Sequence, residues 1–199
     1  MYPEKTLSLI SDMGFSGIEV FLNSNSEFSM DYIRQFKSSC DGLGLQVMSV
    51  HPFTAFAEPQ FFFSNYDRRF TEGLELYKKY FSSAAYLGAT YFNLHGGLAV
   101  QSIQPAEYAE IFYRLQSAAR QEGMILSQEN VARCKCGCLD YLSEVCRCLN
   151  GNICLTLDIK QAHLAGEDPF QMIDMLGEFI SLCHINDFDA EHKLSLIHI

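Results

Sequence analysis

Five side chains that can bind a metal ion or transfer a proton each follow a short apolar run along the chain. Carboxylates and imidazoles together form the mixed oxygen and nitrogen donor sets that hold divalent cations, and both can act as general acids or bases. A carboxylate at the end of an apolar run also needs a polar partner, because burying it alone is costly. The five residues are His51, His95, Glu129, Asp158 and His184. They predict one shared site if the fold brings the ends of the runs together.

The apolar runs are predicted to be parallel strands, because near-continuous apolar character is typical of strands covered on both faces. The stretches between them have helical spacing, as in Phe70, Leu74, Tyr77 and Phe81, which are four, three and four residues apart. Strands that alternate with helices indicate right-handed βαβ units. The predicted strands are residues 18–22, 45–50, 90–94, 124–127, 153–157 and 180–183.

Two α/β architectures fit this alternation, an open doubly wound sheet and a closed barrel. In an open sheet, polar residues on five adjacent strands would spread over roughly 20 Å, whereas in a barrel the strand ends converge on one mouth. The glycine-rich phosphate loop that many open sheets carry after the first strand is also missing here. We therefore expect a (β/α)8 TIM barrel.

The length of the chain indicates that this barrel is incomplete. The predicted strands begin about 32 residues apart, so eight units would need about 260 residues, whereas the chain has 199. We expect strands 2–7 of the barrel to be present and strands 1 and 8 to be missing. Residues 1–193 then form one truncated domain, and residues 194–199 (LSLIHI) are predicted to be a non-native tail.

Composition excludes several classes of protein. The net charge is −10, from 24 acidic and 14 basic residues, so no nucleic-acid partner is expected. The sequence has no apolar stretch long enough to span a membrane and no signal-peptide pattern at its beginning. Eight cysteines without such a pattern favour reduced thiols and a cytoplasmic location.

Taken together, these residues resemble the sugar phosphate isomerase/epimerase family of xylose isomerase-like TIM barrels, which is related to apurinic endonuclease family 2. The order and spacing of the motifs carry the resemblance, which spans roughly residues 4–193. The motifs are residues 13–20 (MGFSGIEV), 50–52 (VHP), 94–97 (LHGG), 128–131 (QENV), 157–158 (LD), 165–169 (AGEDP) and 183–187 (CHIND).

The resemblance implies one divalent metal ion, Mn, Mg or Co with Zn as an alternative, held by Glu129, Asp158 and His184. Glu129 is also expected to be the catalytic acid and base. A fourth ligand is expected on the eighth strand and has no counterpart here. Gln161 also stands where many relatives carry a histidine. The remaining candidates are His51 and His95, for substrate or a second metal, and Glu19, Asn186 and Asp187, behind the ligands.

The function that the resemblance implies is a sugar or sugar-phosphate isomerase or epimerase, which moves a proton next to a carbonyl through an enediolate. Its partner would be the small-molecule sugar, with no membrane involved, and a homo-oligomer is compatible with the sequence. We expect this truncated chain to be inactive by itself. Three alternatives stay open: a zinc-dependent hydrolase similar to apurinic-site endonucleases, a polyol dehydratase, and a barrel that binds sugar without turnover.

Overall fold

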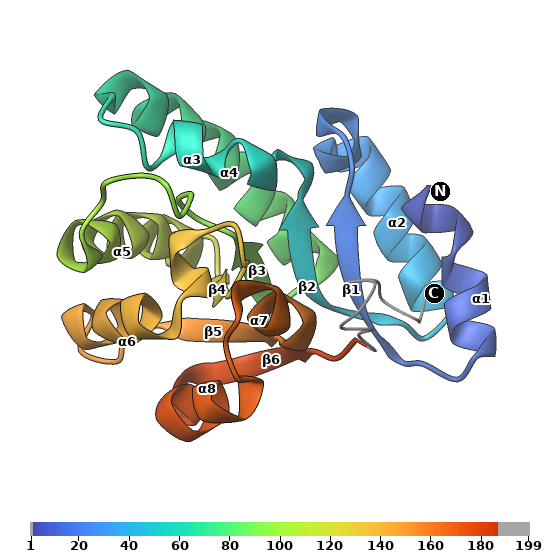
Figure 1. Ribbon diagram of the computed structural model, residues 1–199. Helices are drawn as coiled ribbons and strands as arrows, with labels where there is room; N and C mark the ends of the chain where they lie inside the picture. The colour runs from blue at the N-terminus through green and yellow to red at the C-terminus, as the bar shows by residue number, and fades with distance from the viewer. Residues whose placement is uncertain (1, 187–199) are drawn as a thin grey trace.

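All six predicted apolar runs form strands in the computed structural model, which describes residues 2–186. The strands make one parallel sheet in which each pairs with the next along the chain, and the sheet curls into part of a barrel (Figure 1). This confirms the incomplete (β/α)8 fold. The strands are β1 (Gly17–Leu22), β2 (Gln46–Pro52), β3 (Tyr91–Leu94), β4 (Ile125–Glu129), β5 (Cys154–Asp158) and β6 (Ile180–His184).

The predicted site residues lie within the strand ends rather than beyond them, apart from His95, which follows β3 by one residue. The correction arises because pairing between neighbouring strands continues through these positions. His51 pairs with Phe21 of β1, and Asp158 pairs with His184. Their backbones are therefore held by the sheet, which limits the freedom of the side chains they carry.

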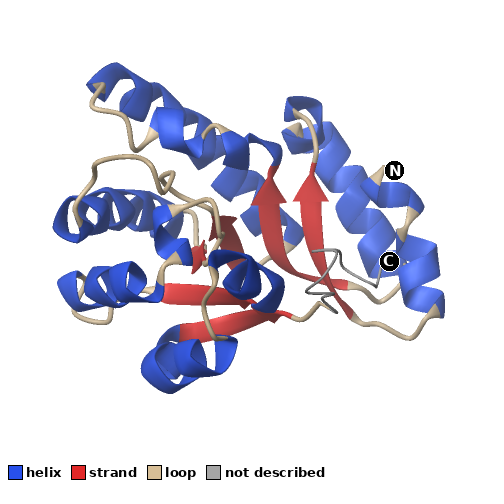
Figure 2. Cartoon of the chain, viewed as in Figure 1, coloured by secondary structure: helices blue, strands red, loops and turns tan. Residues whose placement is uncertain are grey.

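Helices connect successive strands and cover the outer face of the sheet (Figure 2). Short polar side chains begin several of them. Ser29 accepts a hydrogen bond from the Tyr32 backbone at the start of α2, and Asp168 accepts one from Phe170 at the start of α8. The helices are α1 (Leu7–Asp12), α2 (Met30–Gly42), α3 (Glu58–Phe61), α4 (Asp67–Leu87), α5 (Pro105–Gln121), α6 (Leu139–Cys148), α7 (Ile159–Ala165) and α8 (Pro169–Leu176).

The apolar core lies between the outer face of the sheet and these helices. Phe92 of β3 packs edge-on against Phe81 of α4, with ring centroids 4.8 Å apart, and both side chains are fully buried. Tyr77, one helical turn before Phe81, packs against Phe92 as well. Burial of large side chains of this kind is the main favourable term in folding. It fixes the sheet from the outside and leaves the inner face free for polar residues.

The inner face of the sheet is polar. Asn93 of β3 donates to a carboxylate oxygen of Glu19 on β1 at 2.8 Å and accepts from Thr156 of β5 at 2.7 Å. The Thr156 hydroxyl also lies 2.6 Å from that of Ser127 on β4, and Ser49 of β2 hydrogen-bonds to Glu19. Barrel interiors are more often filled by branched apolar residues. Here a hydrogen-bonded layer from five strands supports the mouth.

The first and last strands each pair with a single neighbour within residues 2–186. No helix in this part of the chain is long and apolar enough to cross a membrane. All eight cysteines lie among the described residues, and none of them forms a disulfide there. The predicted tail at 194–199 and the candidate Asp187 lie outside the described residues.

Candidate metal and acid–base centre

Glu129 lies at the centre of the mouth and contacts histidines from three other segments. Its Oε2 is 3.2 Å from Nε2 of His95 and 3.5 Å from Nε2 of His51, and its Oε1 is 3.4 Å from Nδ1 of His184. The residue is 5% exposed. It ends β4, a strand flanked on both sides, so its backbone is held by the sheet. The structure thus brings Glu129 and the three histidines together at the ends of the strands.

Hydrogen bonds hold the backbone of Asp158 and one of its carboxylate oxygens at the end of β5. The side chain of Asn130 accepts from its backbone N–H at 2.6 Å and donates to its carbonyl at 3.0 Å. Its Oδ1 accepts the Gln161 backbone N–H at 2.8 Å and thereby caps α7. The other oxygen, Oδ2, lies 3.6 Å from His184 Nδ1. Oδ2 thus faces the mouth, whereas Oδ1 is occupied by its hydrogen bond to the start of α7.

The candidate Asn186 and the residue Gln161, which departs from the family pattern, both lie beside Asp158. Asn186 places its amide nitrogen 3.5 Å from both Asp158 carboxylate oxygens. The Gln161 side chain accepts the backbone N–H of Ala132 at 2.9 Å. Gln161 therefore ties the loop after β4 to α7. Position 161 is the one at which the family resemblance implies a histidine in many relatives.

Glu19 is more central than the sequence suggested. Its Oε1 is 3.0 Å from Nε2 of His184 and 3.3 Å from Nε2 of His51, so it touches the rings that surround Glu129. Its Oε2 accepts hydrogen bonds from Asn93 and Ser49. The exposed-and-buried alternation of β1 places Glu19 on the inner face. The acidic residue within this apolar run was visible in the sequence, but its contact with His184, on the opposite edge strand, was not.

Sequence reasoning missed Glu58, a fully buried carboxylate beside the site. One of its oxygens accepts the backbone N–H groups of His95 and Gly96, each at 2.8 Å, and the other accepts the Tyr77 hydroxyl at 2.8 Å. Burial raises the pKa of Glu58. Glu58 holds the turn that presents His95. The available signal was a lone acidic residue within a strongly apolar loop, at positions 53–63.

The charges in the mouth shift one another's pKa values. Burial alone would raise the pKa of Glu129, but its contacts with His184 and His95 lower it to about 2. Burial alone would lower the pKa of His184, but the surrounding carboxylates raise it to about 12. The pKa of Glu19 is held far below its usual range by His184 and His51, against the effect of burial. Without a metal ion, Glu129 and Glu19 are therefore ionised and His184 is protonated near neutral pH.

The donor set fits a divalent cation. Glu129 Oε2 is buried and makes no well-aligned hydrogen bond within residues 2–186. Such an oxygen is costly to leave unpaired and is a ready ligand. Three sets of side chains have ligand atoms within 4.8 Å of one another: Glu129, Asp158 and His184; His51, His95 and Glu129; and Glu19, His51 and His184. Oxygen and imidazole donors suit Mn, Mg, Co or Zn.

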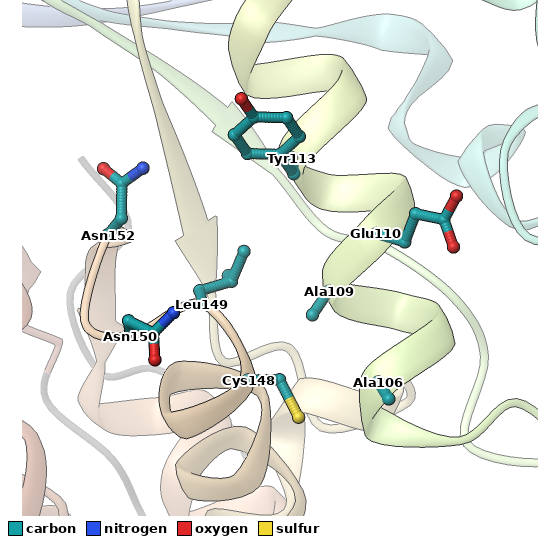
Figure 3. Close-up of a pocket in the computed structure, with 8 residues that line it drawn as sticks. All are labelled: Ala106, Ala109, Glu110, Tyr113, Cys148, Leu149, Asn150 and Asn152. Carbon is teal, nitrogen blue, oxygen red and sulfur yellow. The ribbon is translucent and has the colours of Figure 1, made fainter.

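A surface cavity of about 620 Å³ lies away from this centre, between α5 and the end of α6 (Figure 3). It contains none of the predicted site residues. Its lining is Ala106, Ala109, Glu110, Tyr113, Cys148, Leu149, Asn150 and Asn152. Since the charged groups gather at the strand ends instead, we place the candidate site at the mouth.

Comparison with known proteins identifies the family of this fold. A family described as xylose isomerase-like TIM barrel matches residues 7–195. No curated protein sequence matches significantly. Solved structures of similar fold include a sugar phosphate isomerase/epimerase from Parabacteroides distasonis, with 17% identity and a TM-score of 0.66, covering 90% of this chain and 68% of that one.

Two further solved structures widen the range of chemistry seen on this fold. One is D-allulose 3-epimerase from a Methylomonas species, in complex with D-allulose, with 16% identity, a TM-score of 0.74 and coverage of 91% of this chain and 65% of that one. The other is the probable 3-DHS dehydratase of petrobactin synthesis from Bacillus anthracis, with 15% identity, a TM-score of 0.75 and coverage of 96% and 70%. At these identities the likeness shows the fold alone. The chain spans about two thirds of the length of these proteins.

Proposed function

The chain belongs to the xylose isomerase-like TIM barrel family, and we propose that its mouth is the site of a metal-dependent sugar or sugar-phosphate isomerase or epimerase. One observation carries the proposal. Glu129 is a buried carboxylate surrounded by three imidazoles, and a second carboxylate, Asp158, lies beside the same Nδ1 atom of His184. A structural role alone does not account for so many titratable groups on the inner face of one sheet.

Glu129, Asp158 and His184 are the residues that would hold the cation, because they come from three adjacent strands and offer two oxygens and one nitrogen. Mn, Mg or Co suits this set, and Zn is the alternative. When bound, such an ion acts as a Lewis acid that stabilises negative charge on substrate oxygens. The protein contributes the fixed geometry, since Asn130 clamps the backbone of Asp158 on both its donor and its acceptor side.

Glu129 would move the proton. Its carboxylate takes the proton from the carbon next to the substrate carbonyl, which leaves an enediolate. It then returns the proton to the neighbouring carbon in an isomerisation, whereas an epimerisation would need a second acid on the opposite face to reprotonate the same carbon. His51 and His95 flank Glu129 Oε2 at 3.5 and 3.2 Å and would bind substrate hydroxyls. The polar layer beneath them keeps these side chains in place.

Proton exchange tests the proposal with the chain as it stands. Ketohexoses and ketose phosphates are incubated in D2O with the chain and Mn²⁺, and deuterium at carbons next to the carbonyl is followed by NMR. We expect slow incorporation that needs both Mn²⁺ and Glu129. Net interconversion by residues 1–199 stays predicted to be absent, because no eighth-strand carboxylate lies among the described residues. Tight sugar binding without any exchange would favour a non-catalytic barrel instead.

One observation favours a second candidate, a zinc-dependent hydrolase that acts on abasic DNA. His51, His95 and Glu129 form a cation set of their own, as a site with several zinc ions would require. Against it, Gln161 is committed to the Ala132 backbone, and the net charge of −10 opposes DNA binding. Cleavage of an abasic duplex by the zinc-loaded chain, without sugar exchange, would support the hydrolase. A polyol dehydratase would release water from its substrate, which the same NMR experiment detects.

A further inference from the structure

The imidazole of His184 has carboxylates on both sides. Its Nδ1 lies 3.4 Å from Glu129 and 3.6 Å from Asp158, whereas its Nε2 lies 3.0 Å from Oε1 of Glu19. Nε2 is buried and has no well-aligned hydrogen bond within residues 2–186, so no other described group holds its proton. The two nitrogens of one ring therefore face different carboxylates, two at Nδ1 and a third at Nε2.

Only one of these nitrogens can bind a cation while the imidazole is neutral, because the other nitrogen then carries the proton. A neutral imidazole has one N–H and one lone pair, so a ring that gives its lone pair to a metal ion keeps its proton on the other nitrogen. The acceptor that faces this proton fixes the orientation of the ring and raises its strength as a ligand. The side on which His184 binds a cation therefore depends on which carboxylate accepts its proton.

Glu19 is built to be that acceptor. Its Oε2 is occupied by hydrogen bonds from Asn93 and Ser49, which come from two other strands. Asn93 is fixed in turn by Thr156 on a fourth strand. Only Oε1 is left to face His184, and the same oxygen lies 3.3 Å from His51. The carboxylate thus cannot turn away from the ring without breaking the polar layer of the sheet.

We propose that Glu19 is a positioning residue that accepts the Nε2 proton of His184 and so reserves Nδ1 for the cation held with Glu129 and Asp158. The inference rests on the proposed function for the location of that cation. It assigns Glu19 no contact with substrate. It also explains why an acidic residue stands in the middle of β1, where the strand would otherwise expose it at the open side of the sheet.

NMR of the unaltered chain gives the first test. The chain is labelled with ¹⁵N-histidine and loaded with Zn²⁺, and the His184 signals are assigned by their loss in His184→Gln. We expect Zn²⁺ on Nδ1 and a retained proton on Nε2. Coordination through Nε2 would overturn the proposal, as would a second equivalent of Zn²⁺ held by Glu19, His51 and His184. Absence of Zn²⁺ binding would overturn both this proposal and the proposed function.

Two substitutions of Glu19 give the second test, with Zn²⁺ affinity measured by competition with a chelator. Glu19→Leu removes the acceptor and should weaken binding about 10- to 100-fold. Glu19→Gln keeps an amide oxygen and should retain most of the affinity. Glu27→Leu is the control, because Glu27 is a more deeply buried glutamate than Glu19 and accepts from the Asn23 backbone, away from the histidines.

The pattern of results separates Glu19 from the proposed function. Wild-type affinity in a folded Glu19→Leu chain would overturn the role of Glu19, as would equal losses in Glu19→Leu and Glu27→Leu. Zn²⁺ on Nδ1 together with the expected Glu19 effects, but no deuterium exchange with any sugar, would refute the isomerase and leave the positioning role standing. Circular dichroism reports whether each variant is folded, and the NMR test uses His184→Gln for signal assignment alone.

Discussion

The central strands and the edge strands of the sheet contribute to the same site in different ways. Every residue of β5 is buried, whereas every residue of β6 is partly or fully exposed. The same contrast holds for the site: the Glu129 side chain on central strand β4 is 6% exposed, whereas the Glu19 side chain on edge strand β1 is 31% exposed. The centre is held by packing on the outer face. The edges are held by polar contacts that reach across the curve of the sheet.

This difference follows from how each strand is covered. A central strand has a partner on both sides and helices behind it, so its residues are fixed by hydrogen bonds and by burial together. β1 and β6 each have one partner within the described residues. Side chains on them need specific contacts to stay in place, and Glu19 and His184 supply these contacts to each other at 3.0 Å.

The largest effect should come from the centre of the site. Glu129→Gln keeps the shape of the side chain but removes the base, so the rate of deuterium exchange should fall about 10²- to 10⁴-fold. Glu27→Gln, a change of another buried glutamate, should leave the rate unaltered. Exchange at the wild-type rate in Glu129→Gln would remove Glu129 from the mechanism.

The contrast in packing can be measured with leucines on the two kinds of strand. Leu126 of β4 is fully buried, so Leu126→Ala should lower the free energy of unfolding by about 3 kcal/mol. Leu182 of β6 is only partly buried, and Leu182→Ala should cost less than about 1.5 kcal/mol. Urea unfolding followed by circular dichroism compares them. Equal losses would mean that the edge is as tightly packed as the centre.

Asn130 should affect the cation site without touching the cation. Its side chain makes both hydrogen bonds to the backbone of Asp158, so Asn130→Ala should weaken Mn²⁺ binding about 10-fold. Asn152→Ala is the control, because Asn152 precedes β5 and contacts Arg120, at the opposite end of the strand from Asp158. Titration calorimetry measures both variants. Unchanged Mn²⁺ affinity in Asn130→Ala would show that the position of Asp158 does not depend on this clamp.

The smallest effect is expected at the edge. Cys183 of β6 is exposed and Cys154 of the adjacent β5 is buried. Cys183→Ser should change the free energy of unfolding by no more than about 0.5 kcal/mol. In the native chain a thiol reagent should modify Cys183 and leave Cys154 unmodified until unfolding, as read by mass spectrometry. Fast modification of Cys154 would show that β6 opens from the sheet.

The sequence predicted the strands and most of the site because both depend on local signals. Glu129 and Asp158 end strongly apolar runs, and their convergence follows from the topology of parallel strands. Glu19 and Glu58 were placed less well or missed, because their roles depend on contacts with residues far along the chain. Glu58 contacts the backbone of His95, 37 residues later, and Glu19 contacts Asn93, 74 residues later.

The central claim is that Glu129, Asp158 and His184 hold one divalent cation. A crystal structure of the chain grown with Mn²⁺ tests this most directly, because anomalous scattering locates the ion. The account predicts a single anomalous peak bound by a carboxylate oxygen of Glu129, Oδ2 of Asp158 and Nδ1 of His184. A peak between His51 and His95 without Asp158, or no peak at the strand ends, would contradict it.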